Sequence, residues 1–99
     1  MKVISSQRYL NENKVAEKME ELKAERVETL TLEVWEVGID DLCILCDGHH
    51  RLAAAKELGI EVEFVADSHP EGLTGEDLLE RAWIDSDWYY IETGKNVWQ

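Results

Sequence analysis

The densest group of chemically capable side chains in this chain lies in the sequence CDGHHRLAAAKELG, residues 46–59. Five consecutive residues there combine acidic, flexible, imidazole and cationic character: Asp47, Gly48, His49, His50 and Arg51. They lie between an apolar segment and an alanine- and leucine-rich run, so they would form the loop before a helix and the first turn of that helix. The first N–H groups of a helix lack internal partners and carry partial positive charge. This combination favours an anion-binding pocket, most often one for phosphate.

A second interpretation of the same residues needs no ligand. Asp47 is a residue type favoured at helix N-caps, and its carboxylate would compete with an anion for the same amides. His49, His50 and Arg51 would then be an exposed polar patch on the first turn. The residues alone leave both interpretations open.

Two cysteines, Cys43 and Cys46, form a CxxC in the apolar sequence DLCILCD. This sequence is typical of a buried strand, on which residues three apart point to opposite faces. A disulfide or joint metal chelation would then have poor geometry. Adding His49 and His50 would crowd four ligands into eight residues, closer than usual zinc spacings. We therefore expect two core thiols and no metal site. His69, in a polar loop, is expected to be exposed.

Apolar periodicity predicts the elements that must position the motif. A short strand near Val3 and Ile4 precedes a helix over residues 11–26, which Asn11 or Asn13 can cap. Two strands, over residues 27–37 and 42–46, lead into the helix that ends at Gly59. A strand over 60–66 and a helix before residue 83 complete the order β-α-β-β-α-β-α. This pattern predicts an α+β domain with a small mixed sheet flanked by helices.

Length and charge restrict the function. The chain has 99 residues, which favours one domain, and a net charge of −12. Residues 61–99 carry 10 acids against 2 bases, whereas residues 1–60 carry 12 against 8. Such a field repels phosphate backbones, so direct nucleic-acid binding is disfavoured. No run approaches the roughly 18 apolar residues of a membrane span. The first ten residues do not resemble a secretory signal, so we expect a cytoplasmic protein.

Aromatic residues concentrate in the acidic C-terminal region, where no clear period is visible: Trp83, Trp88, Tyr89, Tyr90 and Trp98. We expect part of this set to pack against the sheet. The rest is a candidate surface for a basic protein partner, because aromatic side chains anchor interfaces and acidic groups attract cationic ones.

The order of residues in CDGHHRLAAAKELGIEVEFV resembles the nucleotide-binding segment of the ParB/sulfiredoxin superfamily. ParB-type partition proteins carry G-E-R-R-x-R-A between a strand and a helix, sulfiredoxins carry G-C-H-R, and free-serine kinases carry D-G-H-H-R. The last is closest to residues 47–51. Gln7-Arg8 is similar to the Q-P-R after the first strand of ParB, without its proline. The resemblance covers residues 1–66 of a single domain, 1–99, and leaves residues 67–99 as an acidic aromatic extension.

The resemblance implies that this turn binds the phosphates of ATP or CTP, with magnesium. The residues that would hold them are Asp47, Gly48, His49, His50, Arg51 and Arg8. Asp47 would bind the metal or orient a histidine. The nucleophilic cysteine of sulfiredoxins falls at His49 here, so the resemblance does not extend to peroxiredoxin repair. Glu12, Glu17 and Asp47 are all candidates for a catalytic base, and the sequence does not choose among them.

Two functions are compatible with these observations. The first is a minimal ParB/sulfiredoxin-like nucleotide- or phosphate-binding domain with weak phosphohydrolase or phosphotransfer activity. The second is an acidic protein-binding module, such as an immunity protein, an antitoxin or a phage- or plasmid-borne modulator, that uses the same fold without catalysis. Whether the protein is an enzyme is left open by the sequence.

Overall fold

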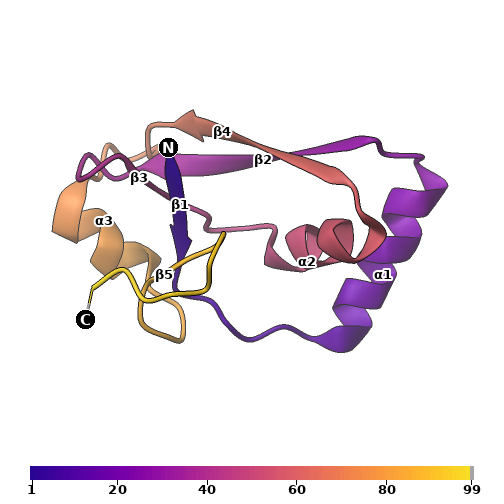
Figure 1. Ribbon diagram of the computed structural model, residues 1–99. Helices are drawn as coiled ribbons and strands as arrows, with labels where there is room; N and C mark the ends of the chain where they lie inside the picture. The colour runs from indigo at the N-terminus through magenta and orange to yellow at the C-terminus, as the bar shows by residue number, and fades with distance from the viewer. Residues whose placement is uncertain (99) are drawn as a thin grey trace.

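The computed structural model describes residues 1–98 and forms an α+β domain (Figure 1). Its elements follow the order β1 (Lys2–Ser5), α1 (Glu12–Ala24), β2 (Thr29–Glu36), β3 (Leu42–Ile44), α2 (His49–Leu58), β4 (Glu61–Asp67), α3 (Gly75–Ala82) and β5 (Tyr89–Tyr90). The predicted fold class and the first seven elements are confirmed. The predicted order lacked β5, because a strand of two residues is too short to show alternation.

The five strands form one mixed sheet in the order β4-β2-β3-β1-β5. β2 and β4 are parallel and pair along their length, from Thr29 with Glu61 to Trp35 with Asp67. β1 is parallel to β3 and antiparallel to β5. β2 pairs with β3 only through its last two residues. In the described sheet, residues 29–34 of β2 therefore have no strand partner on the side away from β4.

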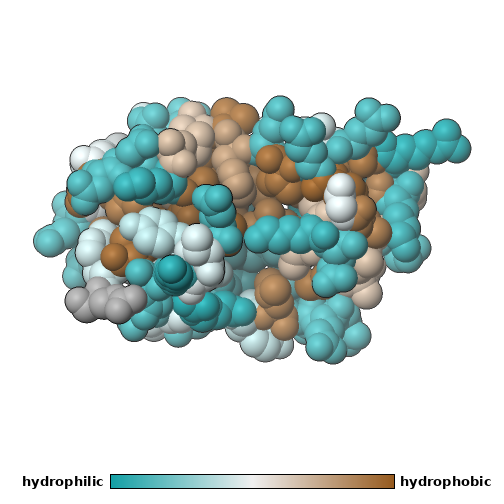
Figure 2. All heavy atoms as spheres, viewed as in Figure 1, coloured by the Kyte–Doolittle hydropathy of each residue, from teal (hydrophilic) through white to brown (hydrophobic). Residues whose placement is uncertain are grey.

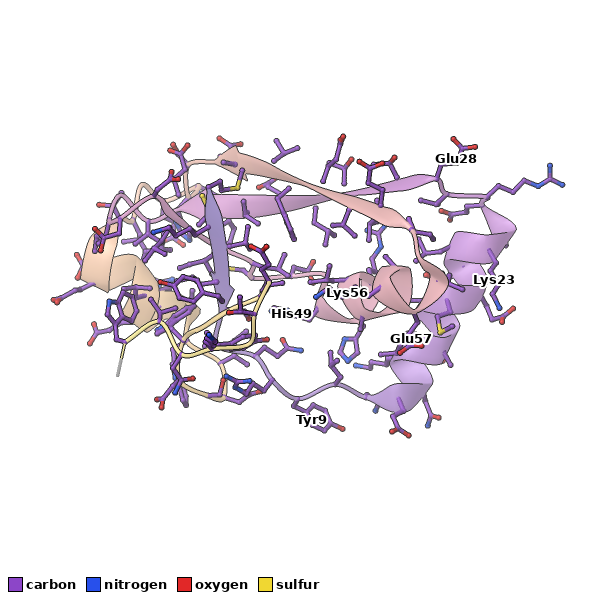
Figure 3. All side chains as sticks on the ribbon, viewed as in Figure 1. Tyr9, Lys23, Glu28, His49, Lys56 and Glu57 are labelled. Atoms are coloured by element: carbon purple, nitrogen blue, oxygen red, sulfur yellow. The ribbon has the colours of Figure 1, made fainter. Side chains whose placement is uncertain are left out.

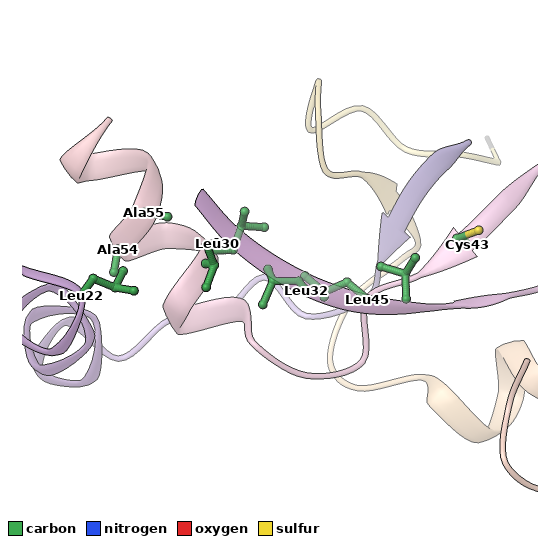
Figure 4. Close-up of a cluster of buried hydrophobic side chains, with 9 residues drawn as sticks. Leu22, Leu30, Leu32, Cys43, Leu45, Ala54 and Ala55 are labelled. Carbon is green, nitrogen blue, oxygen red and sulfur yellow. The ribbon is translucent and has the colours of Figure 1, made fainter. Parts of the chain in front are cut away.

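One face of the sheet is covered by α1 and α2, which lie together at one end of the molecule (Figure 1). Alternation along β2 directs Leu30, Leu32 and Val34 to this face, where they belong to one buried cluster with Leu22 of α1. Figure 4 shows Leu22 and Leu30 in this cluster. Ala54 and Ala55 of α2 complete this core and are fully buried. The small alanine side chains allow α2 to approach the sheet closely.

The opposite face carries a second core beneath α3. Leu78 of α3 packs there against Ile4, Val37, Leu42 and Ile44. β3 contributes to both cores, which explains why its sequence is apolar at every position rather than alternating.

The two cysteines are free thiols, as predicted. Cys43 belongs to the core beneath α1 and α2, whereas Cys46 packs against the core beneath α3. The prediction for His69 was wrong. Its ring is buried, packs edge-on against Trp35 with centroids 4.5 Å apart, and accepts the N–H of Glu71 at Nδ1.

The C-terminal segment folds back along β1. The carbonyl of Ser6 accepts the N–H groups of Asp85 and Ser86, and Ile91 donates to the carbonyl of Val3. The aromatic residues divide as expected: the two in β5 and Trp88 are half-buried, whereas Trp83 and Trp98 are exposed. Within residues 1–98, no helix has both the length and the apolar character that crossing a bilayer requires.

Candidate functional site

The motif that the sequence singles out forms the turn between β3 and α2. Gly48, not Asp47, occupies the N-cap position of α2, with φ of 91° and ψ of 15°. The carboxylate of Asp47 accepts the N–H of Gly48 at 2.8 Å, and no side chain accepts a bond from the first turn of the helix. The interpretation of Asp47 as the N-cap is therefore wrong. In the described residues, the amides of His49, His50 and Arg51 have no intramolecular acceptor.

Glycine is required at position 48 for two reasons. Its left-handed backbone conformation is costly for any residue with a Cβ atom. A Cβ atom placed there would also lie 2.9 Å from Cδ2 of Leu32, which is buried in the core. The turn is consequently held close against β2.

A hollow of about 510 Å³ opens in front of the turn. We call it the motif hollow; the residues that line it and that could meet a ligand through polar groups are Gln7, Lys18, Thr31, Glu33, Asp47, Gly48, His49, His50 and Arg51. The structure thus brings all five residues of the motif to one cavity. Thr31 and Glu33 belong to the part of β2 that lacks a partner toward β3, and this gap in the sheet is where the hollow lies.

His49 is the most buried member of the motif. Its Nε2 lies 2.6 Å from Oγ of Ser5 in β1, and that Oγ also accepts the N–H of Gln7. Burial lowers the pKa of His49 and outweighs the opposing effect of Asp47, so the ring is neutral at neutral pH. A serine bonded to a neutral histidine can be a nucleophile, but Ser5 is fully buried. The pair therefore fixes the ring, and only Nδ1 of His49 is left for a ligand.

His50 is also held by one ring nitrogen. Its Nε2 accepts the N–H of Asn11 at 3.1 Å. Asn11 is the N-cap of α1, where its side chain accepts from the amides of Asn13 and Lys14. An imidazole that accepts through Nε2 carries its proton on Nδ1. His50 thus ties the two helix N-termini together and keeps one N–H donor.

Formal charges around the motif hollow balance. Arg51 is exposed and forms no ion pair within residues 1–98, and Lys18 of α1 lies 3.3 Å from Glu21. Asp47 and Glu33 contribute two negative charges, which equal in number the positive charges of Lys18 and Arg51. Net charge therefore does not favour an anion here, and any attraction for one would come from the uncapped amides and from Arg51.

Arg8 does not line the motif hollow. Its guanidinium lies over the ring of Tyr89, 4.1 Å from the centroid, and donates to the carbonyl of Gly94 and to Oδ1 of Asn96. Its backbone N–H donates to Asp85. Arg8 is therefore held by the C-terminal segment. The residues next to Arg8 in the sequence could not indicate this contact, because its partners lie more than 70 positions away.

Other candidates from the sequence lie elsewhere or are unreactive. Glu12 and Glu17 do not line the motif hollow, whereas Asp47 does. Cys46 lines it, but burial, with a contribution from Asp47, raises the pKa of its thiol to about 11. A thiol of that pKa stays protonated at neutral pH and is a poor nucleophile. No group of three or more metal-ligating side chains occurs within residues 1–98.

Several residues in or beside the site were missed from the sequence: Ser5, Asn11 as a partner of His50, Lys18, Thr31 and Glu33. Ser5 carried one signal, since a serine inside an apolar strand is a candidate for a buried hydrogen bond. Lys18 carried none, because the face of α1 that meets α2 depends on how the helices pack.

Comparisons of this chain with family models, with curated proteins and with solved structures give no match.

Proposed function

We propose that the protein is a nucleotide- or phosphate-binding domain and that the motif hollow holds the phosphates. One observation carries this proposal: the first three amides of α2 are uncapped, and the three residues that bear them, His49, His50 and Arg51, all line one cavity. A helix N-terminus of this kind offers several N–H donors to one anion, and Arg51 adds a charged, forked donor.

We also propose a ParB/sulfiredoxin-like fold for the chain. The order of elements supports this assignment, as does the passage from strand to D-G-H-H-R turn to helix at residues 42–58. If this assignment holds, nucleoside triphosphates, ATP or CTP, are the ligands to test first.

The residues of the motif hollow are compatible with a magnesium ion that arrives with a nucleotide. Mg²⁺ in such sites is held by one or two carboxylates together with phosphate oxygens and water. Asp47 uses Oδ1 for the N–H of Gly48 and has Oδ2 left, and Glu33 is the second carboxylate of the cavity. The ion would neutralise phosphate charge that these two carboxylates otherwise repel.

Thermal unfolding with and without ligand tests the proposal. ATP, CTP and inorganic phosphate are each added with and without Mg²⁺. A ligand at ten times its Kd contributes about 1.4 kcal/mol, which raises the Tm of a domain this size by roughly 5–10 °C. Arg51→Gln should remove most of the shift. Arg26→Gln is the matched control, since Arg26 is exposed, lies at the end of α1 and does not line the motif hollow.

Absence of a shift with every ligand at millimolar concentration would overturn the binding proposal. An equal shift in the Arg51 and Arg26 variants would place binding elsewhere on the chain. Release of phosphate from bound nucleotide, measured on the same samples, separates a hydrolase from a binding domain.

A second function, docking of a basic protein, is supported by a different surface. The face of β2 and β4 opposite α1 and α2 presents Glu33, Glu61, Glu63 and Asp67, all exposed, and no basic residue. We propose that this acidic strand face binds a cationic partner, as an immunity protein or an antitoxin would. A complex of this kind weakens steeply with salt. Charge reversal by Glu61→Lys with Glu63→Lys should abolish it, whereas Glu20→Lys on α1 should not.

A further inference from the structure

A second cavity, separate from the motif hollow, has a different chemistry. It has a volume of about 550 Å³ and lies on the sheet face that α1 and α2 cover. Its apolar wall is formed by Val3, Leu52, Val62, Phe64, Tyr90 and Ile91. We call it the α2–β5 groove, because α2 and the segment after β5 form its two sides. Its volume falls within the range of small-molecule sites.

The groove exists because the helices cover only part of this face. α1 and α2 pack over one end of the sheet (Figure 1). Residues 90–93 lie beside β1, at the edge of the sheet, and they line the groove together with Leu52 and Lys56 of α2. The surface in this view shows apolar residues gathered between hydrophilic ones (Figure 2). Val3, Val62 and Phe64 are only half-buried. Covering such apolar surface is favourable by about 25 cal/mol per Å².

Cations stand at the rim of this apolar wall. Lys56 of α2 and Lys2 of β1 both line the groove, and neither forms an ion pair within residues 1–98. Figure 3 shows Lys56 on α2, beside the space between this helix and the C-terminal segment. Glu92 is the one carboxylate of the lining, so the local charge is positive in a chain of net charge −12.

Lys56 also lines a smaller adjoining hollow of about 170 Å³, together with Arg8 and His49. Leu52 and Ile91 belong to both cavities, so the apolar wall continues from one to the other. Arg8 forms no ion pair with a carboxylate in the described residues, although its guanidinium is held over Tyr89. The positive end of the groove is therefore the junction at Lys56.

We propose that the α2–β5 groove binds a small amphipathic anion, with an apolar body on the sheet and a carboxylate at Lys56. An apolar wall with few polar groups fixes such a ligand by burial, and the lysine fixes its direction. A cationic ligand would be repelled by Lys56, and a fully polar anion would leave the apolar wall uncovered. This inference is independent of phosphate binding in the motif hollow.

Sodium decanoate is the probe, added to ¹⁵N-labelled full-length protein below its critical micelle concentration. We expect saturable shifts at the amides of Val3, Leu52 and Ile91, in a two-dimensional amide spectrum. 1-Decanol, which has the same apolar body without charge, should bind roughly fivefold more weakly, the scale of one partly exposed charge pair. Lys56→Met retains the aliphatic stem and should reduce decanoate affinity to that of decanol.

Lys14→Met on α1 is the matched control and should leave decanoate affinity unchanged, because Lys14 does not line the groove. Arg51→Gln should also bind decanoate normally, which separates this result from any failure of phosphate binding. Shifts that do not saturate, or that map outside the groove, would overturn the proposal. Equal binding of decanoate by wild type and Lys56→Met would overturn the assignment of the carboxylate.

Discussion

Oγ of Ser5 lies 2.6 Å from Nε2 of His49, although 44 residues separate them along the chain. Both side chains are buried, and the bond connects β1 to the first turn of α2. It fixes the motif turn from the sheet side, while the bond from Asn11 to His50 fixes it from the side of α1. The two imidazoles of the motif thus position the helix N-terminus, and each keeps one ring nitrogen, Nδ1, without a partner in the described residues.

Ser5→Ala should lower the free energy of unfolding by about 1–3 kcal/mol, because it leaves a buried ring nitrogen of His49 without a partner. Urea unfolding followed by fluorescence measures the change. Ser68→Ala is the control, since Ser68 is exposed in a loop and its hydroxyl forms no hydrogen bond in the described residues. Equal stability of the two variants would show that the Ser5 bond contributes nothing.

Stability should fall as the pH drops below about 6.5, the ordinary pKa of histidine. Burial lowers the pKa of His49 in the folded protein, so the unfolded chain takes up a proton that the folded chain does not. The free energy of unfolding then decreases with falling pH, by at most about 1.4 kcal/mol per pH unit from this group. Chemical denaturation from pH 7.5 to 5 measures the slope.

The variant His49→Gln provides the reference for this pH effect. It should be less stable at neutral pH but show a flatter dependence, because the titrating ring is gone. An NMR titration in which the His49 ring protonates at or above its ordinary pKa would contradict the assignment.

Gly48→Ala should be more destabilising than Gly59→Ala. Both glycines have positive φ, 91° and 70°, so both substitutions carry a backbone cost of about 1–2 kcal/mol. Only at position 48 does the new Cβ also meet Leu32, at 2.9 Å, whereas nothing lies within 4 Å at position 59. Thermal and urea unfolding of the two variants measure the difference. Equal losses of stability in the two variants would mean that the turn is not held against β2.

Cys46 should be alkylated slowly in the folded protein. Its pKa of about 11 leaves far less thiolate at neutral pH than a free cysteine has, which slows iodoacetamide on the order of 100-fold. Mass spectrometry of timed samples measures the rate at each cysteine. In urea, both thiols should react at the rate of an unstructured cysteine. Fast reaction of Cys46 in buffer would contradict a raised thiol pKa at this position.

Arg8→Met should loosen the C-terminal segment without unfolding the domain. The substitution removes the contact with the Tyr89 ring and the bonds to Gly94 and Asn96. All of these contacts are partly exposed, so the free energy of unfolding should fall by about 1 kcal/mol. Hydrogen exchange should accelerate over residues 89–97 and stay unchanged in α1. Arg26→Met, remote from this segment, should change neither region.

Local sequence patterns determined much of the fold. The alternation of Leu30, Leu32 and Val34 defined β2 and the face that it buries, and Gly59 correctly predicted the end of α2. Thr74 occupies the N-cap position of α3, but its side chain forms no capping hydrogen bond. The sequence shows a threonine where the helix begins, but it does not show whether the hydroxyl of that threonine reaches a backbone amide.

The sequence by itself determined that D-G-H-H-R would stand at a strand-to-helix turn, because periodicity and glycine are local properties. Only the tertiary structure decided what that turn can do. The N-cap of α2 is Gly48 and not Asp47, and the close approach of this position to Leu32 requires a residue without a side chain. The tertiary structure also drew Arg8 to Tyr89 and paired His49 with Ser5. Those contacts join residues more than 40 positions apart, and their geometry depends on how the strands and helices pack.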